Sequence, residues 1–325
     1  MKILTWIAVL LALVVIGLGA YTRLTDAGLG CPDWPGCYGH LTVPSTDHHL
    51  AKAEASFPGV PVEPHKAWNE MIHRYFAGIL GLCIFALFSL ACWYRARERG
   101  LALALLSLVV FQALLGMWTV TMSLRPAIVM GHLLGGFCTL ALLWLMGLRL
   151  SGWRVPGGEV RLRHYRHFAG LVLVVLVVQI ALGGWTSSNY AALACTQLPF
   201  CEGQWWTRLH PEDAFNLVSP PAENYQYGVL GYEARMTIHV THRLGALVTA
   251  LLVSALAVLL LRHGLSGRFR QLGWLLFVLV LAQVGLGVAN VVLMLPLPVA
   301  LAHNLVAVLL LLSLVTVNYG LWRKA

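Results

Sequence analysis

Long apolar runs, separated by short polar stretches, dominate this chain. Eight of them are long enough to span a bilayer, which takes about 20 residues each. The runs lie at 3–20, 73–93, 101–121, 127–148, 167–186, 238–261, 271–293 and 299–320. Apolar residues are continuous within each run rather than alternating, which favours helices over the strands of a barrel. The pattern predicts an all-α integral membrane protein with eight transmembrane helices.

Composition agrees with this interpretation. The chain is 59% hydrophobic and only 11% charged, whereas soluble domains carry about 25% charged residues. The first run, 3–20, follows Lys2 and could also be a secretory signal. It has a counterpart in the second half of the chain, where cleavage makes no sense, so we predict a retained first helix.

The basic residues are concentrated on one side of the predicted bundle. That side holds fourteen of the 22 Lys and Arg residues, but only Glu98 and Glu159 of the 13 acids. It comprises the N-terminus, 94–100, 149–166, 262–270 and the C-terminus. By the positive-inside rule both termini are cytoplasmic, and the long loops 21–70 and 187–234 face outward. The net charge of +9 is therefore a topology signal, and nucleic-acid binding is not expected.

The second half of the chain repeats the first. Matching residues are separated by an offset that drifts from 164 to 171, as changes in loop length would produce. The pairs are Thr22/Thr186, Cys31/Cys195, Cys37/Cys201, His73/His242, Gln112/Gln283, Gly116/Gly287 and His132/His303. Four spans return the chain to its starting side. The repeat therefore predicts two tandem, pseudo-symmetric four-helix bundles, 1–150 and 167–325, joined by a basic cytoplasmic linker, 151–166, that contains Pro156, Gly157 and Gly158.

Each half places one histidine on its second helix and one on its fourth, at matching depth. Imidazole is the usual axial ligand of haem iron, and helix bundles build cofactor sites from facing helices. A zinc site would need a further ligand nearby, and none repeats in both halves. We therefore predict two haem sites, one between His73 and His132 and one between His242 and His303. The alternative is that these histidines only lie at the membrane interface.

The two halves differ three residues before the first histidine of each pair. Glu70 precedes His73, whereas His239 precedes His242, and this spacing puts each pair on one helix face. A carboxylate beside a ligand can act as a base or hold a proton; the alternative is an interfacial ion pair with Arg74. The difference suggests chemistry in the first half and cofactor binding alone in the second. Arg74 and its counterpart Arg243 could meet haem propionates or simply snorkel.

The cysteines fall into two groups. Cys31/Cys37 and Cys195/Cys201 lie in outward loops at identical spacing, and we predict two intraloop disulfides in an oxidising compartment. A metal site is disfavoured because the pairs have no added ligands in register, and a redox role for Cys31/Cys37 is the alternative to structural bracing. The remaining cysteines are expected inside helices as small core residues: Cys83, Cys92 and Cys138.

Several motifs together resemble the haem A synthase family over essentially the whole chain. They are Gly-Leu-Gly-Cys-Pro-Asp-Trp-Pro-Gly-Cys at 28–37, Asn-Glu-Met-Ile-His-Arg at 69–74, the doubled Cys loops, the histidines on the even-numbered helices and the eight spans. The resemblance implies oxidation of the C8 methyl of haem O to a formyl group, giving haem A for terminal oxidases. Two successive hydroxylations would give a geminal diol that loses water.

The same resemblance implies roles for the halves. The first would hold substrate haem between His73 and His132 with Glu70 as a catalytic residue beside it, and the second would hold haem b, with His239 outside the ligand set. It also implies a multi-pass protein of a bacterial inner membrane, with haem sites near the periplasmic face. Haem O synthase and terminal oxidase assembly are the expected partners besides lipid, and a homo-oligomer is left open.

Two rival functions remain at this stage. A non-catalytic di-haem b electron carrier would need no difference between Glu70 and His239, so the asymmetry speaks against it. A haem transporter or chaperone would use the repeat for alternating access, but such proteins usually carry broken helices at mid-membrane. Here the polar groups gather at one face instead.

Overall fold

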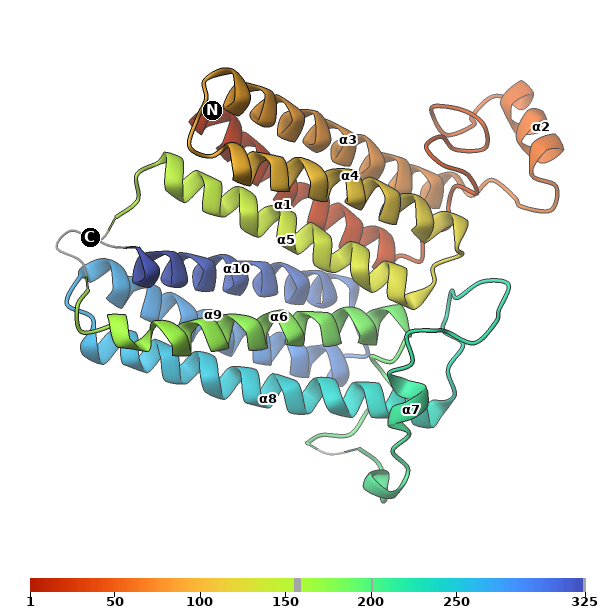
Figure 1. The fold of residues 1–325 in the computed structure, drawn as a ribbon. Helices are drawn as coiled ribbons and strands as arrows, with labels where there is room; N and C mark the ends of the chain where they lie inside the picture. Colours follow the sequence, from red (N-terminus) through yellow and green to blue (C-terminus); the bar gives the residue numbers. More distant parts are fainter. Residues whose placement is uncertain (155–158, 200, 324–325) are drawn as a thin grey trace. The chain divides into compact units, whose positions relative to one another are not determined.

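A computed structural model describes residues 1–154, 159–199 and 201–323 (Figure 1). Eight helices in these ranges are long and apolar enough to cross a membrane, which confirms the predicted helical class and span count. They are α1 (Lys2–Leu24), α3 (Pro64–Trp93), α4 (Arg99–Thr121), α5 (Pro126–Leu150), α6 (Arg166–Ser188), α8 (Tyr232–His263), α9 (Gly267–Val292) and α10 (Leu297–Trp322). The short helices are α2 (Asp47–Ser56), η1 (Arg163–Tyr165), η2 (Trp205–Thr207) and α7 (Pro211–Ala214). The linker residues Pro156, Gly157 and Gly158 lie outside the described ranges.

Two helices extend well beyond their apolar runs. α3 begins at Pro64, which occupies the first turn, where a missing backbone N–H costs nothing. α8 begins at Tyr232. His73 therefore lies inside α3, roughly 13 Å along the axis from its start at 1.5 Å per residue. Residues in the second and third turns of these helices, Glu70 on α3 and His239 on α8, bind the Cys loops.

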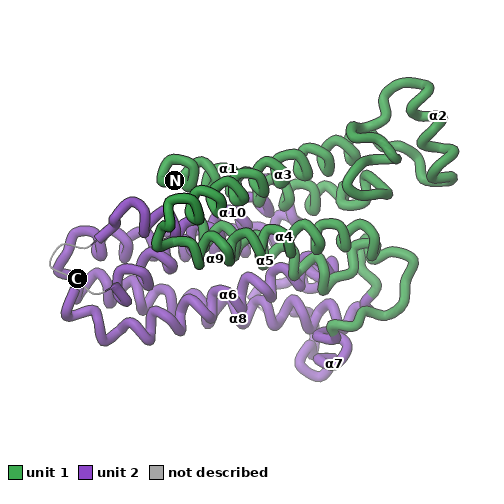
Figure 2. The backbone as a smooth tube through the Cα atoms, turned by 45° about the horizontal axis from the view of Figure 1, so that its top comes forward, with its two compact units in different colours: residues 1–143, 217–229 green, residues 144–216, 230–325 purple. Residues whose placement is uncertain are grey.

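The chain forms two compact units, shown in different colours in Figure 2. Unit 1 comprises 1–143 and 217–229, and unit 2 comprises 144–216 and 230–325. The units divide α5 between them, so the predicted halves 1–150 and 167–325 stay a prediction.

Within unit 2 the four long helices form a closed ring. α6 packs on α8, α8 on α9, α9 on α10, and α10 on α6. Within unit 1, α3 packs on both α1 and α4.

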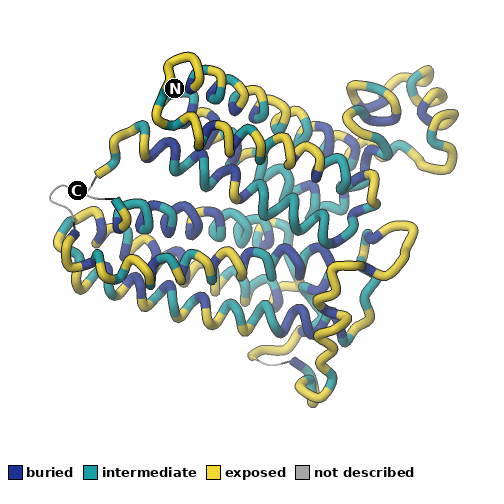
Figure 3. Tube along the Cα trace, in the orientation of Figure 1, coloured by how far each residue is buried: buried dark blue, intermediate teal, exposed yellow. Residues whose placement is uncertain are grey.

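The long helices bury one face and expose another that is also apolar (Figure 3). On α8, for example, Val253 and Leu256 are buried, whereas Leu247 and Leu251 are exposed. Extended exposed apolar surface of this kind is typical of contact with lipid. The expectation that the free cysteines are core residues is wrong for two of them, because Cys92 and Cys138 lie on exposed faces of their helices.

A short segment of the second outer loop, 217–229, belongs to unit 1. The amide of Tyr225 donates to the carbonyl of Ser123 at 2.9 Å, in the turn between α4 and α5. The side chain of Gln226 donates to the carbonyl of Asp26 at 3.2 Å, in the loop after α1. Tyr225 is buried, and its hydroxyl donates to the carbonyl of Pro220 at 3.0 Å. The segment therefore covers two turns of unit 1, one after α1 and one between α4 and α5.

Within unit 2, a buried carboxylate caps a helix. Glu159 accepts hydrogen bonds from the amides of Leu265, at 3.1 Å, and Ser266, at the start of α9. We expect Glu159→Ala to destabilise the protein by about 1–3 kcal/mol, because it leaves two partly buried amides without their acceptor. Thermal unfolding in detergent measures this. Glu98→Ala is the control, since the Glu98 side chain makes no hydrogen bond at the start of α4; equal losses in the two variants would contradict the capping role.

Candidate functional site

His73 on α3 and His132 on α5 face each other within unit 1. Their ring centroids are 6.4 Å apart and their planes are inclined at 85°. Two imidazoles that bind one metal ion through nitrogens about 2 Å away place their ring centres roughly 6 Å apart. In both rings Nδ1 is buried without a hydrogen-bond partner. The spacing of the pair therefore fits two axial ligands of one iron.

Each of the four predicted ligands lies against a glycine of a neighbouring helix. A Cβ built on the glycine would come within 2.9 to 3.3 Å of the histidine Cε1 atom. The pairs are Gly19/His73, Gly116/His132, Gly183/His242 and Gly287/His303. The glycines keep the offsets of the sequence repeat, so the two units position their histidines in the same way.

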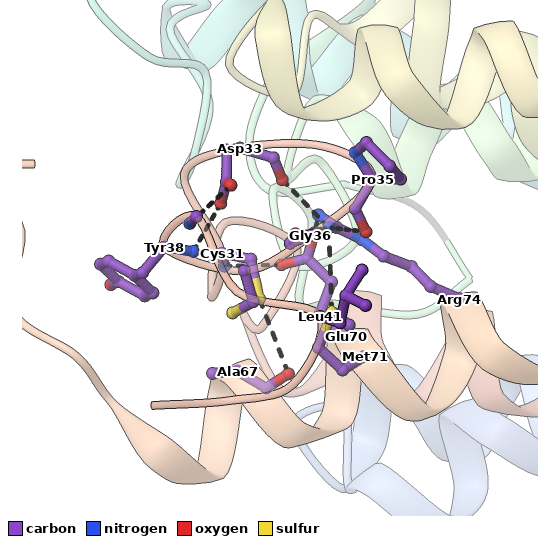
Figure 4. Close-up of a disulfide and its surroundings, with 12 residues drawn as sticks. Cys31, Asp33, Pro35, Gly36, Tyr38, Leu41, Ala67, Glu70, Met71 and Arg74 are labelled. Carbon is purple, nitrogen blue, oxygen red and sulfur yellow. Dashed lines mark hydrogen bonds and ion pairs between the residues drawn. A yellow bond between two sulfur atoms is a disulfide. The ribbon is translucent and has the colours of Figure 1, made fainter. Parts of the chain in front are cut away.

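Glu70 and Arg74 clamp the first Cys loop onto α3 (Figure 4). Glu70 is buried, accepts a hydrogen bond from the amide of Cys31 at 3.0 Å, and forms an ion pair with Arg74. The guanidinium of Arg74 also donates to the backbone carbonyls of Asp33, at 3.0 Å, and Gly36. The ion pair between Glu70 and Arg74 that the sequence left open is therefore present. Arg74 is directed to the loop backbone.

The loop held by this clamp is closed by the predicted disulfide. Cys31 and Cys37 are bonded and fully buried, with Cα atoms 4.8 Å apart. The carboxylate of Asp33 accepts the amides of Tyr38 and Gly39 at 2.6 and 2.8 Å. Burial raises the pKa of the Tyr38 phenol above its ordinary value, and its hydroxyl donates to a backbone carbonyl. The loop is thus a small packed structure at the end of α3.

Unit 2 repeats the clamp with a histidine in place of the glutamate. The amide of Cys195 lies 3.2 Å from Nδ1 of His239, and Nε of Arg243 lies 3.2 Å from its Nε2. Arg243 also donates to the carbonyls of Gln197, at 2.8 Å, and Cys195, at 2.6 Å. Cys195 and Cys201 are joined by a disulfide, with Cα atoms 5.2 Å apart.

The glutamate and the histidine differ in what they can accept. A carboxylate accepts from both donors, whereas a neutral imidazole accepts at only one nitrogen. His239 therefore satisfies only one of Cys195 and Arg243 at a time. Because both of its nitrogens face these donors, the geometry favours a positioning role for His239 over a role as a haem ligand.

Comparison with known proteins gives the family. Residues 2–315 match the family described as cytochrome oxidase assembly protein, COX15-CtaA. This chain belongs to the COX15-CtaA family. It is 50% identical to the haem A synthase of Shewanella oneidensis, over 99% of this chain and 98% of the relative. It is 31% identical to the haem A synthase of Chelativorans sp. and 30% identical to that of Methylobacterium radiotolerans, in both cases over 98% of this chain and 89% of the relative. The resemblance inferred from the motifs is confirmed.

One further cluster in this COX15-CtaA protein has metal-ligand chemistry. Ligand atoms of Cys195, Cys201 and Glu202 lie within 4.8 Å of one another, but disulfide-bonded sulfurs are not the thiolates that bind metals. Glu202 instead accepts from the hydroxyl and amide of Thr196 and the amide of Gln197. The Thr196 hydroxyl is the main cause that lowers the pKa of Glu202 to about 2. The ionised carboxylate therefore stabilises the folded loop at pH values above the ordinary pKa of a glutamate, and this contribution is lost as the pH falls toward 2.

Two features of the site were not predicted from the motifs. Gln179 on α6 lies beside His242, with its Nε2 3.0 Å from Nδ1 of the ring. Gln283, noted only as a repeated residue, has its Nε2 3.2 Å from Nε2 of His303. The offset of 164 pairs Gln179 with Val15, so a search for identical residues passes over it.

The close approach of Gly19 to His73 gives a direct prediction. In Gly19→Ala the new Cβ would lie 2.9 Å from Cε1 of His73 and must displace the ring. We expect a loss of haem from the first half of about 10-fold or more, the usual cost of disturbing the support of a metal ligand. Haem content by chromatography of extracted pigments measures it. Gly78→Ala on α3, where a Cβ meets nothing within 4 Å, is the control; equal haem content in the two variants would argue against the site.

Proposed function

We propose that this protein is a haem A synthase, which oxidises the C8 methyl of haem O to a formyl group. The observation that carries the proposal is the facing pair His73 and His132, with ring centroids 6.4 Å apart, together with the buried Glu70 one turn before His73, where the second half has His239. Relatives named haem A synthase, aligned over nearly the whole chain, support the same activity.

In this proposal the first half binds the substrate. His73 and His132 hold the iron of haem O, and the iron supplies redox chemistry that no side chain here can perform. Glu70, one turn before His73 on α3, is the catalytic carboxylate that accepts or supplies a proton beside the substrate. Arg74 keeps Glu70 paired and fixes the Cys loop over this end of α3.

The second half holds a haem that is not consumed. His242 and His303 bind haem b for electron transfer, and His239 and Arg243 hold the second Cys loop. The closed ring of α6, α8, α9 and α10 supports a four-helix bundle here. The repeated glycine–histidine pairs support its pseudo-symmetry with the first half.

The proposed setting is a bacterial inner membrane with both termini in the cytoplasm. The excess of basic residues at the predicted cytoplasmic ends supports this orientation. The disulfides support an oxidising compartment, the periplasm, on the side of the Cys loops and haem sites. Haem O synthase would supply the substrate, and assembly of a terminal oxidase would consume the product.

The haem extract of cells with and without the gene tests the proposal. We expect haem A only when the gene is present, and accumulation of haem O when it is deleted. Complementation with the intact gene should restore haem A, whereas an empty vector should not. Identical haem composition in all strains would contradict an enzyme and favour the electron-carrier or chaperone alternative.

A further inference from the structure

Basic residues gather at one end of unit 2, with a single acid among them. The segments 149–166, 262–270 and 323–325 hold five, three and two Lys or Arg residues, and their one acid is Glu159. The carboxylate of Glu159 is buried and accepts two amides at the start of α9. Within the part of these segments that the structure describes, no arginine forms an ion pair. This end of unit 2 therefore carries positive charge that no carboxylate of the described chain neutralises.

Three of these arginines surround the C-terminal end of α10. Arg166 begins α6, Arg268 lies in the first turn of α9, and Arg323 directly follows α10. Both α6 and α9 pack on α10, and the three helix ends lie together in unit 2 (Figure 1). The start of α6 has neither a side-chain cap nor an acidic residue in its first turn. No carboxylate there offsets the positive end of the helix dipole, which adds to the charge of the arginines.

Two of the guanidinium groups lie over tryptophan rings. Cζ of Arg166 is 4.8 Å from the ring centroid of Trp322, and Cζ of Arg268 is 5.9 Å from that of Trp153. Nε of Arg166 donates to Nε2 of His167 at 3.2 Å, whereas its two terminal nitrogens make no hydrogen bond within the described residues. Arg166 and Trp322 are both exposed. The ring holds the guanidinium by a cation–π contact and leaves it a pair of donors that suits a phosphate.

The end of α10 is fixed within the same cluster. Nη1 of Arg323 donates to the carbonyl of Trp153 at 2.8 Å and to the hydroxyl of Tyr319 at 2.6 Å. The ring of Trp153 packs on Gly320, where a Cβ would come within 3.1 Å of it. The arginines and tryptophans are therefore held in place by the fold. Tryptophans are enriched where a helix bundle meets the boundary between membrane and water.

An exposed apolar stripe continues from this cluster along α6. Leu171, Val174 and Val178 are all exposed, and their spacing of three and four residues puts them on one face of the helix. His167 lies one turn before Leu171 and so shares this face. An anionic phospholipid has the same succession of parts, a phosphate followed by apolar chains. The basic cluster and the stripe are thus arranged in the order that such a lipid requires.

We infer that this end of unit 2 binds the phosphate of an anionic phospholipid, with Arg166 on Trp322 as the main donor. The acyl chains lie along the stripe of Leu171, Val174 and Val178. A soluble phosphate would meet the arginines but leave the stripe unused, and a zwitterionic lipid carries an ammonium group that the basic cluster repels. Basic pockets at the ends of transmembrane helices bind anionic headgroups by the same chemistry. The lipid site is separate from the proposed haem chemistry.

Native mass spectrometry of the full, delipidated chain in detergent tests this site, with phosphatidylglycerol as the probe. We expect the first phosphatidylglycerol to bind more tightly than phosphatidylcholine with the same chains. Arg166→Gln should weaken its binding about 5-fold, the effect of one basic residue at an anionic lipid surface. Arg166→Lys keeps the charge without the flat guanidinium and should fall between parent and Arg166→Gln. Trp322→Ala should also weaken binding, because it removes the ring that holds Arg166.

Arg262→Gln is the matched control. Arg262 lies in the last turn of α8 and is exposed like Arg166, but no aromatic ring of the described chain lies under its guanidinium. This variant should bind phosphatidylglycerol nearly as tightly as the parent. Equal weakening in Arg166→Gln and Arg262→Gln would show a diffuse basic surface and overturn the inference, as would equal binding of the two lipids.

Two further measurements separate the remaining explanations. Displacement of phosphatidylglycerol by inorganic phosphate would assign the site to a soluble anion and overturn the lipid as its ligand. Thermal unfolding without lipid should be the same in Arg166→Gln and Arg262→Gln. If Arg166→Gln did not fold, Arg166→Lys and Trp322→Ala would decide, and parental binding in both would overturn the inference.

Discussion

Replacing His73 with alanine should abolish haem A formation while the haem of the second half stays bound. The ring of His73 faces that of His132 at 6.4 Å, so its loss removes one of the two proposed ligands of the substrate iron. Displacement of a reacting group by about 1 Å can lower a reaction rate 10²-fold. We therefore expect the rate of haem A formation to fall by roughly 100-fold or more. Haem A formed per haem b, measured after co-expression with a haem O source, gives the result.

Two comparisons make this prediction specific. His303→Ala should instead lose haem b from the second half, which His73→Ala retains. His48→Ala, at an exposed position of α2, should change neither haem. Haem A formation at the parental rate in His73→Ala would show that this histidine does not hold the substrate.

Glu70→Gln should nearly stop conversion while leaving haem O bound. The amide keeps the size of the side chain but cannot form the ion pair with Arg74 or exchange a proton as a carboxylate does. Removing a positioned acid–base group typically costs about 10²–10⁴-fold in rate. Haem O bound and haem A formed, both measured by chromatography of the purified variant, separate binding from conversion.

A matched ion pair on the same helix provides the control for this prediction. Glu63 pairs with Lys66 at 2.8 Å, but the Glu63 side chain is 57% exposed and that of Lys66 is 29% exposed, and ion pairs this open to solvent contribute little. Glu63→Gln should therefore convert haem O normally. Thiol labelling should show the Cys31–Cys37 disulfide intact in both variants. If Glu70→Gln formed haem A as fast as Glu63→Gln, Glu70 would be only an anchor for the Cys loop.

The helices were predictable because a membrane span needs a continuous apolar run of fixed length. Their outer ends were not, since the first turns of α3 and α8 are polar and resemble loop. Pro64 can start a helix, and Glu70 of α3 and His239 of α8, in the turns that follow, bind the Cys loops. Tertiary contacts of this kind leave no periodic signal in the sequence.

The residues of the site were likewise predictable only in part. The four histidines could be predicted from the repeat, because identical residues recur at offsets that drift only slowly, and the Glu70–Arg74 pair from its helical spacing. The carbonyl partners of Arg74 depend on the loop conformation, and the docking of Tyr225 on Ser123 joins residues far apart in the chain. Gln179 was missed for another reason. Its counterpart at the repeat offset is Val15, and a repeat is recognised only from matching residues.

The claim that one chain carries two unequal haem sites is tested most directly by the haems of the purified protein. Pyridine-haemochrome spectroscopy with chromatography should be applied to protein expressed together with a haem O source. We predict haem b together with haem O and haem A on the same protein. Haem b alone, at two per chain despite available haem O, would contradict the account and indicate an electron carrier with two equivalent sites.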